Sequence, residues 1–438
     1  MTQERELSAS ERRFQQYLDR LTAVIGHADR AQPLRDYCTG LLLPGERKSV
    51  EPMAARLQPD NVRQWHQSLH HFVATAPWSD EVVLAAVREY GLPLMERQGV
   101  IQAWIVDDTG FPKKGNHSVG VARQYCGQLG KQDNCQVAVS LSVAHQQASL
   151  PVAYQLYLPE SWAKDKPRCR EAGVPEEVVF RTKPEMALEQ IRWAVQEELP
   201  RGVVLADAAY GNDTAFREGI SALGLHYVVG VQETMTLWPP GKVPLLPGGR
   251  GGRGRPPTRL RRDEKHQPVS VAEWAKSLPV SAFRRVSWRE GAAGVLRSRF
   301  AAARVRPAHR DHLRKEVRAE EWLLIEWPED SPEPIKYWLS TLPPSTSLRR
   351  LVDSAQLRWR VERDYQELKQ ELGLGHFEGR GWRGFHHHAA LCLAAYAFLV
   401  AERTAFPPSG DLHWRRKQPP RLPPGFQARG SARQSRTA

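Results

Sequence analysis

The first 95 residues have apolar positions that recur every three or four residues, as in VRQWHQSLHHFVATAPWSDEVVLAAVREYG. This spacing places the apolar side chains on one face of a helix, where they can pack against a core. A Pro-Gly step at Pro44 interrupts the pattern with a turn. Residues 1–95 are therefore predicted to form a helical N-terminal region.

Apolar runs of strand length replace this pattern over residues 96–232. Four of them follow one another through short connections, as in a β-meander: VIQAWIVDD, VGVARQYC, CQVAVSLSVAH and LPVAYQLYL. A helical pattern over 184–198, the strand GVVLADAAYG, a helix near 213–223 and the strand HYVVGVQ come next. Because strands alternate with helices after the meander, we predict a mixed α/β sheet.

Residues 233–345 interrupt this order as a β-rich insertion. The insertion opens with PPGKVPLLPGGRGGRGRPPTRLRR, which has too few apolar residues to pack and is expected to be a mobile or ligand-contacting loop. Amphipathic strands follow it. Two long helices, near 346–372 and 385–403, are predicted to complete the α/β domain, so that 346–403 returns to its core. The Pro- and Arg-rich tail, 404–438, is expected to be disordered.

Composition narrows the class of protein. The chain has 438 residues and a formal net charge of +13, with arginines concentrated in a few segments. Such clustering favours a polyanionic partner. No run reaches the roughly 18 apolar residues of a membrane span, and the N-terminus lacks a signal-peptide pattern, so a cytoplasmic protein is expected. Five cysteines without a CxxC pair support neither a zinc site nor a disulfide framework.

Carboxylates stand at the ends of two predicted strands. Asp107 and Asp108 follow WIV, and Asp207 follows VVLA. The carboxyl ends of neighbouring strands converge on one crevice, which is where α/β sheets build their sites. Each acid taken alone could equally form a turn or cap a helix.

A third element is the predicted helix RWRVERDYQELKQELGLGHF. Arg358, Glu362 and Lys369 lie at spacings of four and seven and therefore share one helix face. In isolation, a solvated face with salt bridges would explain these charges equally well.

Together, a strand Asp, a second strand Asp and a helix Glu resemble the ribonuclease H-like catalytic domain of DDE transposases. The helix is similar to the Y-(2)-R-(3)-E-(6)-K signature of insertion-sequence transposases, with Arg358, Glu362 and Lys369 at R, E and K. Ala355 stands at the Tyr position, a departure that affects a supporting contact. VDDTGFPKKGNHSVGVARQYCGQLGK and LGLGHFEGRGWRGFHHHAALCLAAYAFL resemble the IS701 branch in particular, within a resemblance that runs from about residue 30 to 403.

The resemblance implies an α/β fold with a ribonuclease H-like mixed sheet, and cut-and-paste DNA transposition as the function. Asp108, Asp207 and Glu362 would be both the catalytic residues and the ligands of two Mg²⁺ ions, for which Mn²⁺ substitutes. Three carboxylates without a His/Cys cage suit such hard cations. Asp108 is preferred to Asp107 because the family pattern places the catalytic Asp directly before a Thr; Asp107 would then point to the other side of the strand.

Double-stranded DNA is the implied partner, as terminal inverted repeats and as target. The helical N-terminal region would bind DNA, and a homodimer on DNA is expected because two ends must be cut together. Arg358 and Lys369 would hold phosphates near the scissile bond. Sequence-independent phosphate binding is expected of a basic cluster, Arg250, Arg253, Arg255, Arg259, Arg261 and Arg262.

Two further groups have less specific interpretations. His386, His387 and His388 are adjacent on a helix and point in different directions, so a DNA-facing or capping role is favoured over metal binding. Trp288, Trp322, Trp327 and Trp338 of the insertion could stack on a base drawn out of the duplex, although packing between strands is the ordinary role.

Two rival functions remain open at this point. One is a metal-dependent nuclease of the same fold that cuts DNA without joining it. The other is a domesticated, non-catalytic DNA-binding repressor. The presence of all three acids argues against the repressor.

Overall fold

The computed structural model describes residues 7–247, 258–291 and 294–406. The chain forms two compact units, and neither is a single segment. Unit 1 consists of Met1–Ile101, Asp108–Thr182 and Arg360–Ala438, and unit 2 consists of Gln102–Asp107 and Lys183–Trp359.

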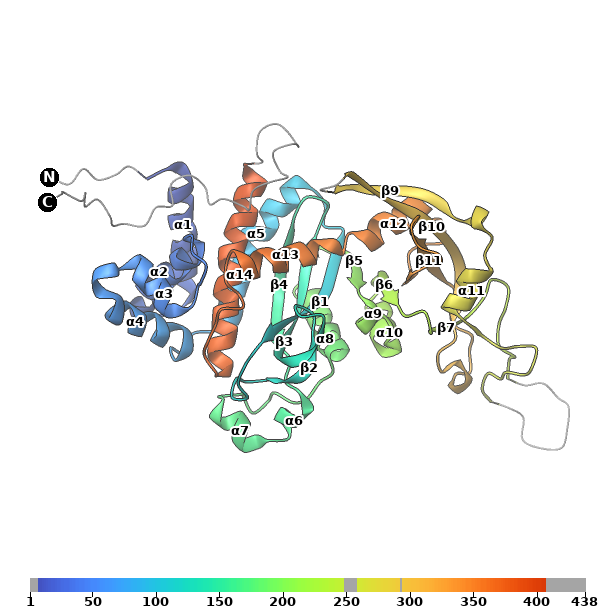
Figure 1. Cartoon of the computed structure of the whole chain (residues 1–438), viewed down its shortest axis with the longest axis horizontal. Coiled ribbons are helices and arrows are strands. Elements are labelled where there is room, and N and C mark those ends of the chain that lie inside the picture. The colour runs from blue at the N-terminus through green and yellow to red at the C-terminus, as the bar shows by residue number, and fades with distance from the viewer. Residues whose placement is uncertain (1–6, 248–257, 292–293, 407–438) are drawn as a thin grey trace. The chain divides into compact units, whose positions relative to one another are not determined.

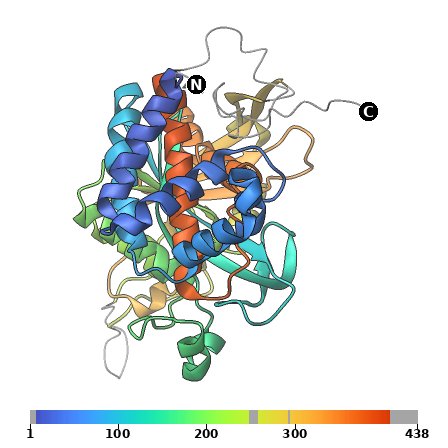
Figure 2. The ribbon, with the colours of Figure 1, turned by 90° about the vertical axis from the view of Figure 1, so that its left-hand side faces the viewer.

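Unit 1 is organised around one apolar helix near the C-terminus. Its helices are α1 (Ala9–Val24), α2 (Ala31–Leu42), α3 (Val50–Leu57), α4 (Val62–Ala74), α5 (Asp80–Gln98), α6 (Glu160–Ala163), α7 (Lys166–Glu171), α13 (Trp359–Gln370, from its second residue on) and α14 (Trp382–Ala405). The helical pattern predicted over 1–95 is thus confirmed for the described part of that range. Helices α2, α4 and α5 pack on α14 (Figures 1 and 2).

The sequence of α14 is apolar on all sides, which is the pattern of a fully buried helix. By length and hydropathy α14 could also cross a membrane, but 94% of its most apolar window is buried inside the protein. The helix is therefore accounted for as the core of unit 1.

The meander predicted after residue 96 is confirmed in unit 1. Its strands are β2 (Ala122–Cys126), β3 (Lys131–Ala144) and β4 (Ser149–Leu156). Strand β3 pairs antiparallel with β2 and with β4. Strand β1 (Ala103–Pro112) is divided, since its residues up to Asp107 belong to unit 2 and those from Asp108 on belong to unit 1.

Unit 2 combines the parallel part of the sheet with the insertion. Its helices are α8 (Lys183–Gln196), α9 (Ala208–Gly211), α10 (Thr214–Ala222), α11 (Val271–Ser277) and α12 (Leu348–Gln356). Its further strands are β5 (Val203–Ala206), β6 (Tyr227–Val231), β7 (Thr236–Trp238), β8 (Val269–Ser270), β9 (Arg284–Gly291), β10 (Gly294–Pro307), β11 (Glu321–Trp327) and β12 (Lys336–Ser340).

The strand order in unit 2 is β1-β5-β6-β12-β11-β10-β7-β8, with β9 paired to β10. The pairs β1–β5 and β5–β6 are parallel, whereas the pairs from β6–β12 onwards are antiparallel. The β-rich insertion therefore extends the mixed sheet through β12, and the predicted mixed α/β fold is confirmed.

The single helix expected near 346–372 is two helices. Helix α12 ends at Gln356, where the N–H of Leu357 bonds to the carbonyls of Asp353 and Ser354, and α13 begins at Trp359. Two predictions concern residues outside the described ranges. They are the phosphate-binding role of Arg250, Arg253 and Arg255, and the disordered tail beyond residue 406.

Candidate active site

Strand β1 brings two acids to the end of a buried run. Trp104, Ile105 and Val106 are fully buried, which is what a central strand covered on both faces requires. Asp107 and Asp108 follow at once and are only half-buried. The two acids therefore form a half-buried step in a strand that is buried again at Thr109 and Phe111.

In unit 2, Asp207 directly follows β5, the parallel neighbour of β1. The register pairs Ala103 with Val203 and Ile105 with Leu205, and the same offset carried two residues past the last pair relates Asp107 to Asp207. Asp207 keeps extended backbone angles (φ −81°, ψ −175°) and caps α9, with its Oδ1 accepting the N–H of Ala209 at 2.9 Å. Unit 2 thus brings Asp107 and Asp207 to one edge of the sheet.

The short connection between α12 and α13 is held at the same edge. An Nη1 of Arg358 donates to Oδ2 of Asp107 at 2.9 Å, and both side chains are largely buried. The next residue, Trp359, lies under the guanidinium of Arg289 from β9, which is 3.7 Å from the indole ring. These two contacts fix the position at which the helix is interrupted.

Within unit 1, α13 contacts the second half of β1 through Lys369. Lys369 donates to the carbonyl of Gly110 at 2.8 Å and to Oε1 of Gln128 at 3.2 Å, and its ammonium lies 5.0 Å from the ring centre of Phe111. Burial lowers the pKa of Lys369 to about 8. Glu362, in the first turn of the same helix, is exposed.

The opposite face of α13 is core, and it carries another acid. Asp364 is fully buried and accepts hydrogen bonds from Ser149 Oγ at 2.6 Å and Tyr396 OH at 2.8 Å. Burial raises the pKa of Asp364 to about 6. Two carboxylates two residues apart on one helix therefore have separate environments, and only Glu362 is open to solvent.

The candidate ligands are distributed over both units. Asp108 and Glu362 lie in unit 1, and Asp207 lies in unit 2. Within the described ranges, no three His, Cys, Asp or Glu side chains are grouped so as to hold a metal ion. The donor chemistry of these partly exposed carboxylates nevertheless suits a hard divalent cation.

Comparison with known proteins shows the family of this chain. Residues 20–295 match the model of a family described as DDE superfamily endonuclease. The chain belongs to the DDE endonuclease superfamily. It is also 28% identical over 334 residues to the "Probable transposase for insertion sequence element IS701" of Microchaete diplosiphon, an alignment that covers 76% of this chain and 72% of that protein. The resemblance inferred from the sequence is confirmed, and the protein is an endonuclease whose superfamily uses divalent metal ions.

Three histidines of this DDE endonuclease differ from expectation. His386, His387 and His388 are all buried, so of the two predicted roles, facing DNA or capping, the first is wrong. His386 accepts the N–H of Leu156, and His387 lies between two backbone carbonyls and stacks on Trp78 at 3.5 Å. They stabilise the packing of α14.

His388 gives the fold of unit 1 a pH dependence. Its Nδ1 bonds to Tyr37 OH at 2.9 Å and its Nε2 lies 3.1 Å from the carbonyl of Gly373, and burial lowers its pKa to about 4. The neutral ring is the form that folds, so its contribution is complete above pH 6.5 and is lost as the pH falls through 4.

We expect His388→Gln to lower the free energy of unfolding by about 1–3 kcal/mol at pH 7, because a buried hydrogen bond is lost. The deficit relative to wild type should narrow towards pH 5, because there the imidazole released on unfolding binds a proton, which stabilises the unfolded state of wild type but not that of the variant. Denaturant unfolding at both pH values measures this. A deficit that stays constant, or that the exposed His70→Gln reproduces, would contradict the assignment.

Tryptophans of the insertion are engaged with protein partners. Trp322 donates to the carbonyl of Pro343 at 3.0 Å and lies under Arg304, while Trp327 donates to Ser331 and lies under Arg299. The strand-packing role thus holds for these two indoles.

The described part of the basic cluster has two kinds of arginine. Arg262 donates to the buried Asp311 at 2.5 Å and is therefore structural, which makes the phosphate-binding prediction wrong for this residue. Arg259 is exposed. Sequence reasoning missed other exposed arginines, Arg284, Arg285 and Arg297, on the hairpin β9–β10. Alternation along RRVSWREG and GVLRSRF was the signal that could have found them.

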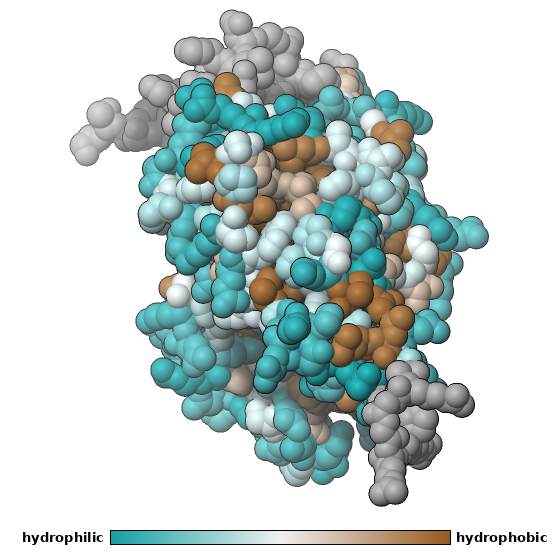
Figure 3. All heavy atoms as spheres, turned by 90° about the vertical axis from the view of Figure 1, so that its right-hand side faces the viewer, coloured by the Kyte–Doolittle hydropathy of each residue, from teal (hydrophilic) through white to brown (hydrophobic). Residues whose placement is uncertain are grey.

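The surface of the insertion is mixed in character. Figure 3 shows hydrophilic residues over much of this side of the molecule, with apolar residues in separate patches. Val280, Val295 and Ile335 are 58%, 56% and 51% exposed. The exposed arginines of β9 and β10 are candidates for contact with a polyanion.

Proposed function

We propose that the chain is a DNA transposase, which cuts DNA at the ends of a mobile element and joins the new 3′-hydroxyls to target DNA. The observation that carries the proposal is the parallel pairing of β1 with β5, which sets acids at the ends of neighbouring strands in a chain of the DDE superfamily. The relative described as a probable transposase supports joining as well as cutting.

The proposed catalytic residues are Asp108, Asp207 and Glu362, which would hold two Mg²⁺ ions, with Mn²⁺ as a substitute. The bound ions supply stabilisation of the attacking and leaving oxygens in an in-line displacement. Asp207 contributes a carboxylate whose orientation is set by the N–H of Ala209. Glu362 contributes an exposed carboxylate from the first turn of α13. Arg358 and Lys369 would neutralise phosphates of the DNA. The hydrogen bond to Asp107 would hold Arg358 in position for this role.

Asp107 is the second candidate for the first ligand. The register with β5 favours Asp107, because the offset of the paired residues, carried past the last pair, relates Asp107 to Asp207. The ion pair with Arg358 favours Asp108, because Asp107 then serves to hold the arginine. The two assignments differ in outcome: Asp107→Asn should weaken DNA binding through Arg358 if Asp108 is the ligand, and should abolish cleavage with DNA binding retained if Asp107 is the ligand.

The proposed partner is double-stranded DNA, as terminal inverted repeats and as target, bound by a homodimer in the cytoplasm. Two copies are proposed because both ends must be cut in one event. The helical N-terminal region would contact DNA. Arg259 and the exposed arginines of β9 and β10 would add salt-sensitive phosphate contacts, as would Arg250, Arg253 and Arg255.

The deciding experiment incubates the full chain with its terminal-repeat DNA, a target plasmid and Mg²⁺ or Mn²⁺. Transposase function predicts both cut ends and end–target joints. Cut ends without joints would favour the nuclease. DNA binding without cutting in either metal would favour the repressor.

Lys369 gives DNA binding a pH dependence. Because its pKa is about 8, Lys369 carries a positive charge below pH 8 and loses that charge above it. The affinity for terminal-repeat DNA should therefore fall between pH 7 and 9. Lys369→Arg should remove this decline, because a guanidinium stays charged. Lys369→Gln should reduce the slope of log affinity against log salt concentration by about one. Fluorescence anisotropy measures both. The role is refuted if Lys369→Arg declines with pH as steeply as wild type.

A further inference from the structure

We propose that Gly230 and Arg217 are positioning residues that fix the backbone of Asp207, and that the β-rich insertion supports them through polar contacts with β6 and α10. The proposal rests on the proposed role of Asp207 as a metal ligand. All of the residues concerned lie in unit 2.

Gly230 allows the turn at Asp207 to lie directly on β6. A Cβ at Gly230 would lie 3.0 Å from the amide nitrogen of Ala208 and 3.2 Å from the carbonyl carbon of Asp207. From the other side, a Cβ at Gly211 would lie 1.9 Å from the carbonyl oxygen of Gly230. The backbone of β6 and the turn from Asp207 to Gly211 are therefore in direct contact, without a side chain between them.

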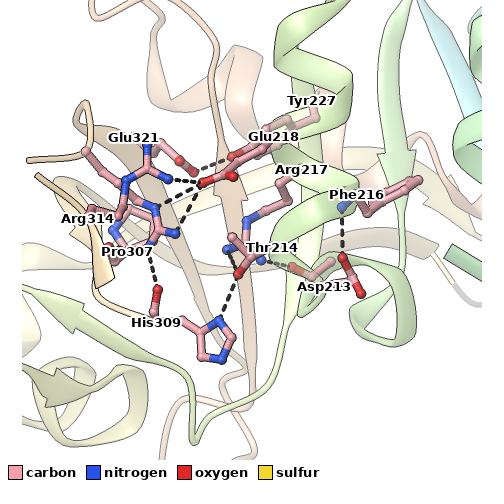
Figure 4. Close-up of polar contacts among 12 residues, drawn as sticks. Asp213, Thr214, Phe216, Arg217, Glu218, Tyr227, Pro307, His309, Arg314 and Glu321 are labelled. Atoms are coloured by element: carbon pink, nitrogen blue, oxygen red, sulfur yellow. Dashed lines mark hydrogen bonds and ion pairs between the residues drawn. The ribbon is translucent and has the colours of Figure 1, made fainter. Parts of the chain in front are cut away.

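Arg217 holds the far end of the same turn. Its side chain is 3% exposed, its Nη1 donates to the carbonyl of Gly211, and its Nη2 lies 3.3 Å from Thr214 Oγ1 (Figure 4). Asp207 begins this turn and Gly211 ends it. The backbone of β6 therefore packs against this turn, and Arg217 of α10 binds the carbonyl at its last residue.

The insertion also places a carboxylate where it interacts with Arg217. Glu321, at the start of β11, accepts from Tyr227 OH at 2.6 Å; burial raises the pKa of Glu321, and Arg217 acts in the opposite direction. A nearby carboxylate stabilises a buried guanidinium, because burial removes the guanidinium charge from water. Tyr227 is the first residue of β6, so these interactions join β11, β6 and α10.

The insertion also holds the outer face of α10. Glu218 accepts from Arg314 at 2.7 Å and from Arg318 at 3.2 Å, and Thr214 Oγ1 lies 2.9 Å from Nδ1 of His309 (Figure 4). These partners come from the segment between β10 and β11. Residues of the insertion therefore contact α10 on two sides, and α10 contacts the turn of Asp207.

This arrangement matters for metal binding because ligands must be held to within about 0.5 Å of their productive position. The Asp207 carboxylate takes its direction from its own backbone and from the N–H of Ala209. Moving that backbone by a few tenths of an ångström, as Gly230→Ala requires, therefore moves the ligand while the side chain itself is unchanged.

The test measures Mn²⁺ affinity, thermal unfolding, and kcat and KM for cleavage in the full chain. Gly230→Ala and Arg217→Met should weaken Mn²⁺ binding about tenfold or more and lower kcat, with KM for DNA little changed, and Arg217→Lys should restore part of the loss. Val228→Ala is the matched control, since it removes buried volume from β6 next to Gly230 and should lower stability without changing Mn²⁺ affinity.

The outcomes separate this inference from the proposed function. Wild-type Mn²⁺ affinity in Gly230→Ala or Arg217→Met would overturn the positioning role, as would an equal loss in Val228→Ala. If Gly230→Ala does not fold, the comparison of Arg217→Met with Arg217→Lys decides, and absence of rescue by lysine overturns the role. Asp207→Asn that binds Mn²⁺ and cleaves as wild type would refute the proposed function itself.

Discussion

Replacing Asp207 with asparagine is expected to lower the rate of DNA cleavage about a thousandfold or more, with folding and DNA binding retained. Asparagine keeps an oxygen that can accept the N–H of Ala209, so the cap of α9 survives while the charge that holds a metal ion is lost. Single-turnover cleavage of terminal-repeat DNA, with anisotropy for binding, measures the two effects separately.

Asp213→Asn is the matched control for this experiment. Asp213 caps α10 as Asp207 caps α9, with its Oδ1 accepting the N–H of Phe216 at 2.8 Å. The substitution removes the same charge from the same kind of helix start, a few residues away. Equal losses of cleavage in the two variants would show that Asp207 acts as a cap and not as a ligand.

The second large effect is expected for Glu362→Gln, which should also reduce cleavage by about a thousandfold and leave the fold intact. The side chain is exposed on α13, so its replacement by an isosteric amide removes charge without creating a cavity. Joining of precleaved ends to target DNA should fall with cleavage, because both steps would use the same carboxylate. Product analysis on gels with intact and precleaved DNA measures each step.

Glu371→Gln controls for the loss of one negative charge near the end of the same helix. It should cleave as wild type does. Cleavage by Glu362→Gln at more than about a tenth of the wild-type rate would remove Glu362 from the catalytic set, and the buried Asp364 could not replace it, since Ser149 and Tyr396 already occupy that carboxylate.

Periodicity was enough to predict the elements of this fold. The N-terminal helices, the meander and the strands before Asp207 and after α10 follow from local patterns of apolar residues, and local patterns are what a sequence displays directly. The same reasoning predicted acids at the ends of buried strands, and β1 and β5 do pair in parallel just before Asp107 and Asp207.

Features that depend on distant partners could not be predicted in this way. The break between α12 and α13 coincides with an ion pair between Arg358 and Asp107, which are 251 residues apart. The burial of His387 depends on carbonyls of Val73 and Trp78, more than 300 positions earlier in the chain. Polar residues within a helical pattern do not reveal whether the fold supplies such partners.

The sequence also could not assign the arginines of the insertion. Arg262 and Arg259 lie three positions apart in one basic run, yet one is fixed by the buried Asp311 and the other is exposed. The difference arises because Asp311 is brought to Arg262 by the chain's return after β10. Net charge therefore indicated a polyanionic partner without showing which side chains are available to it.

The division of the chain between the two units has a consequence for synthesis on the ribosome. Every segment of unit 2 has been synthesised once the ribosome has added Trp359. At that stage unit 1 still lacks α14, the helix on which α2, α4 and α5 pack. The N-terminal helices must therefore wait for the last described helix before their apolar faces are covered. The unit that begins the chain is the last to be completed, which reverses the usual N-terminal-first order of domain folding.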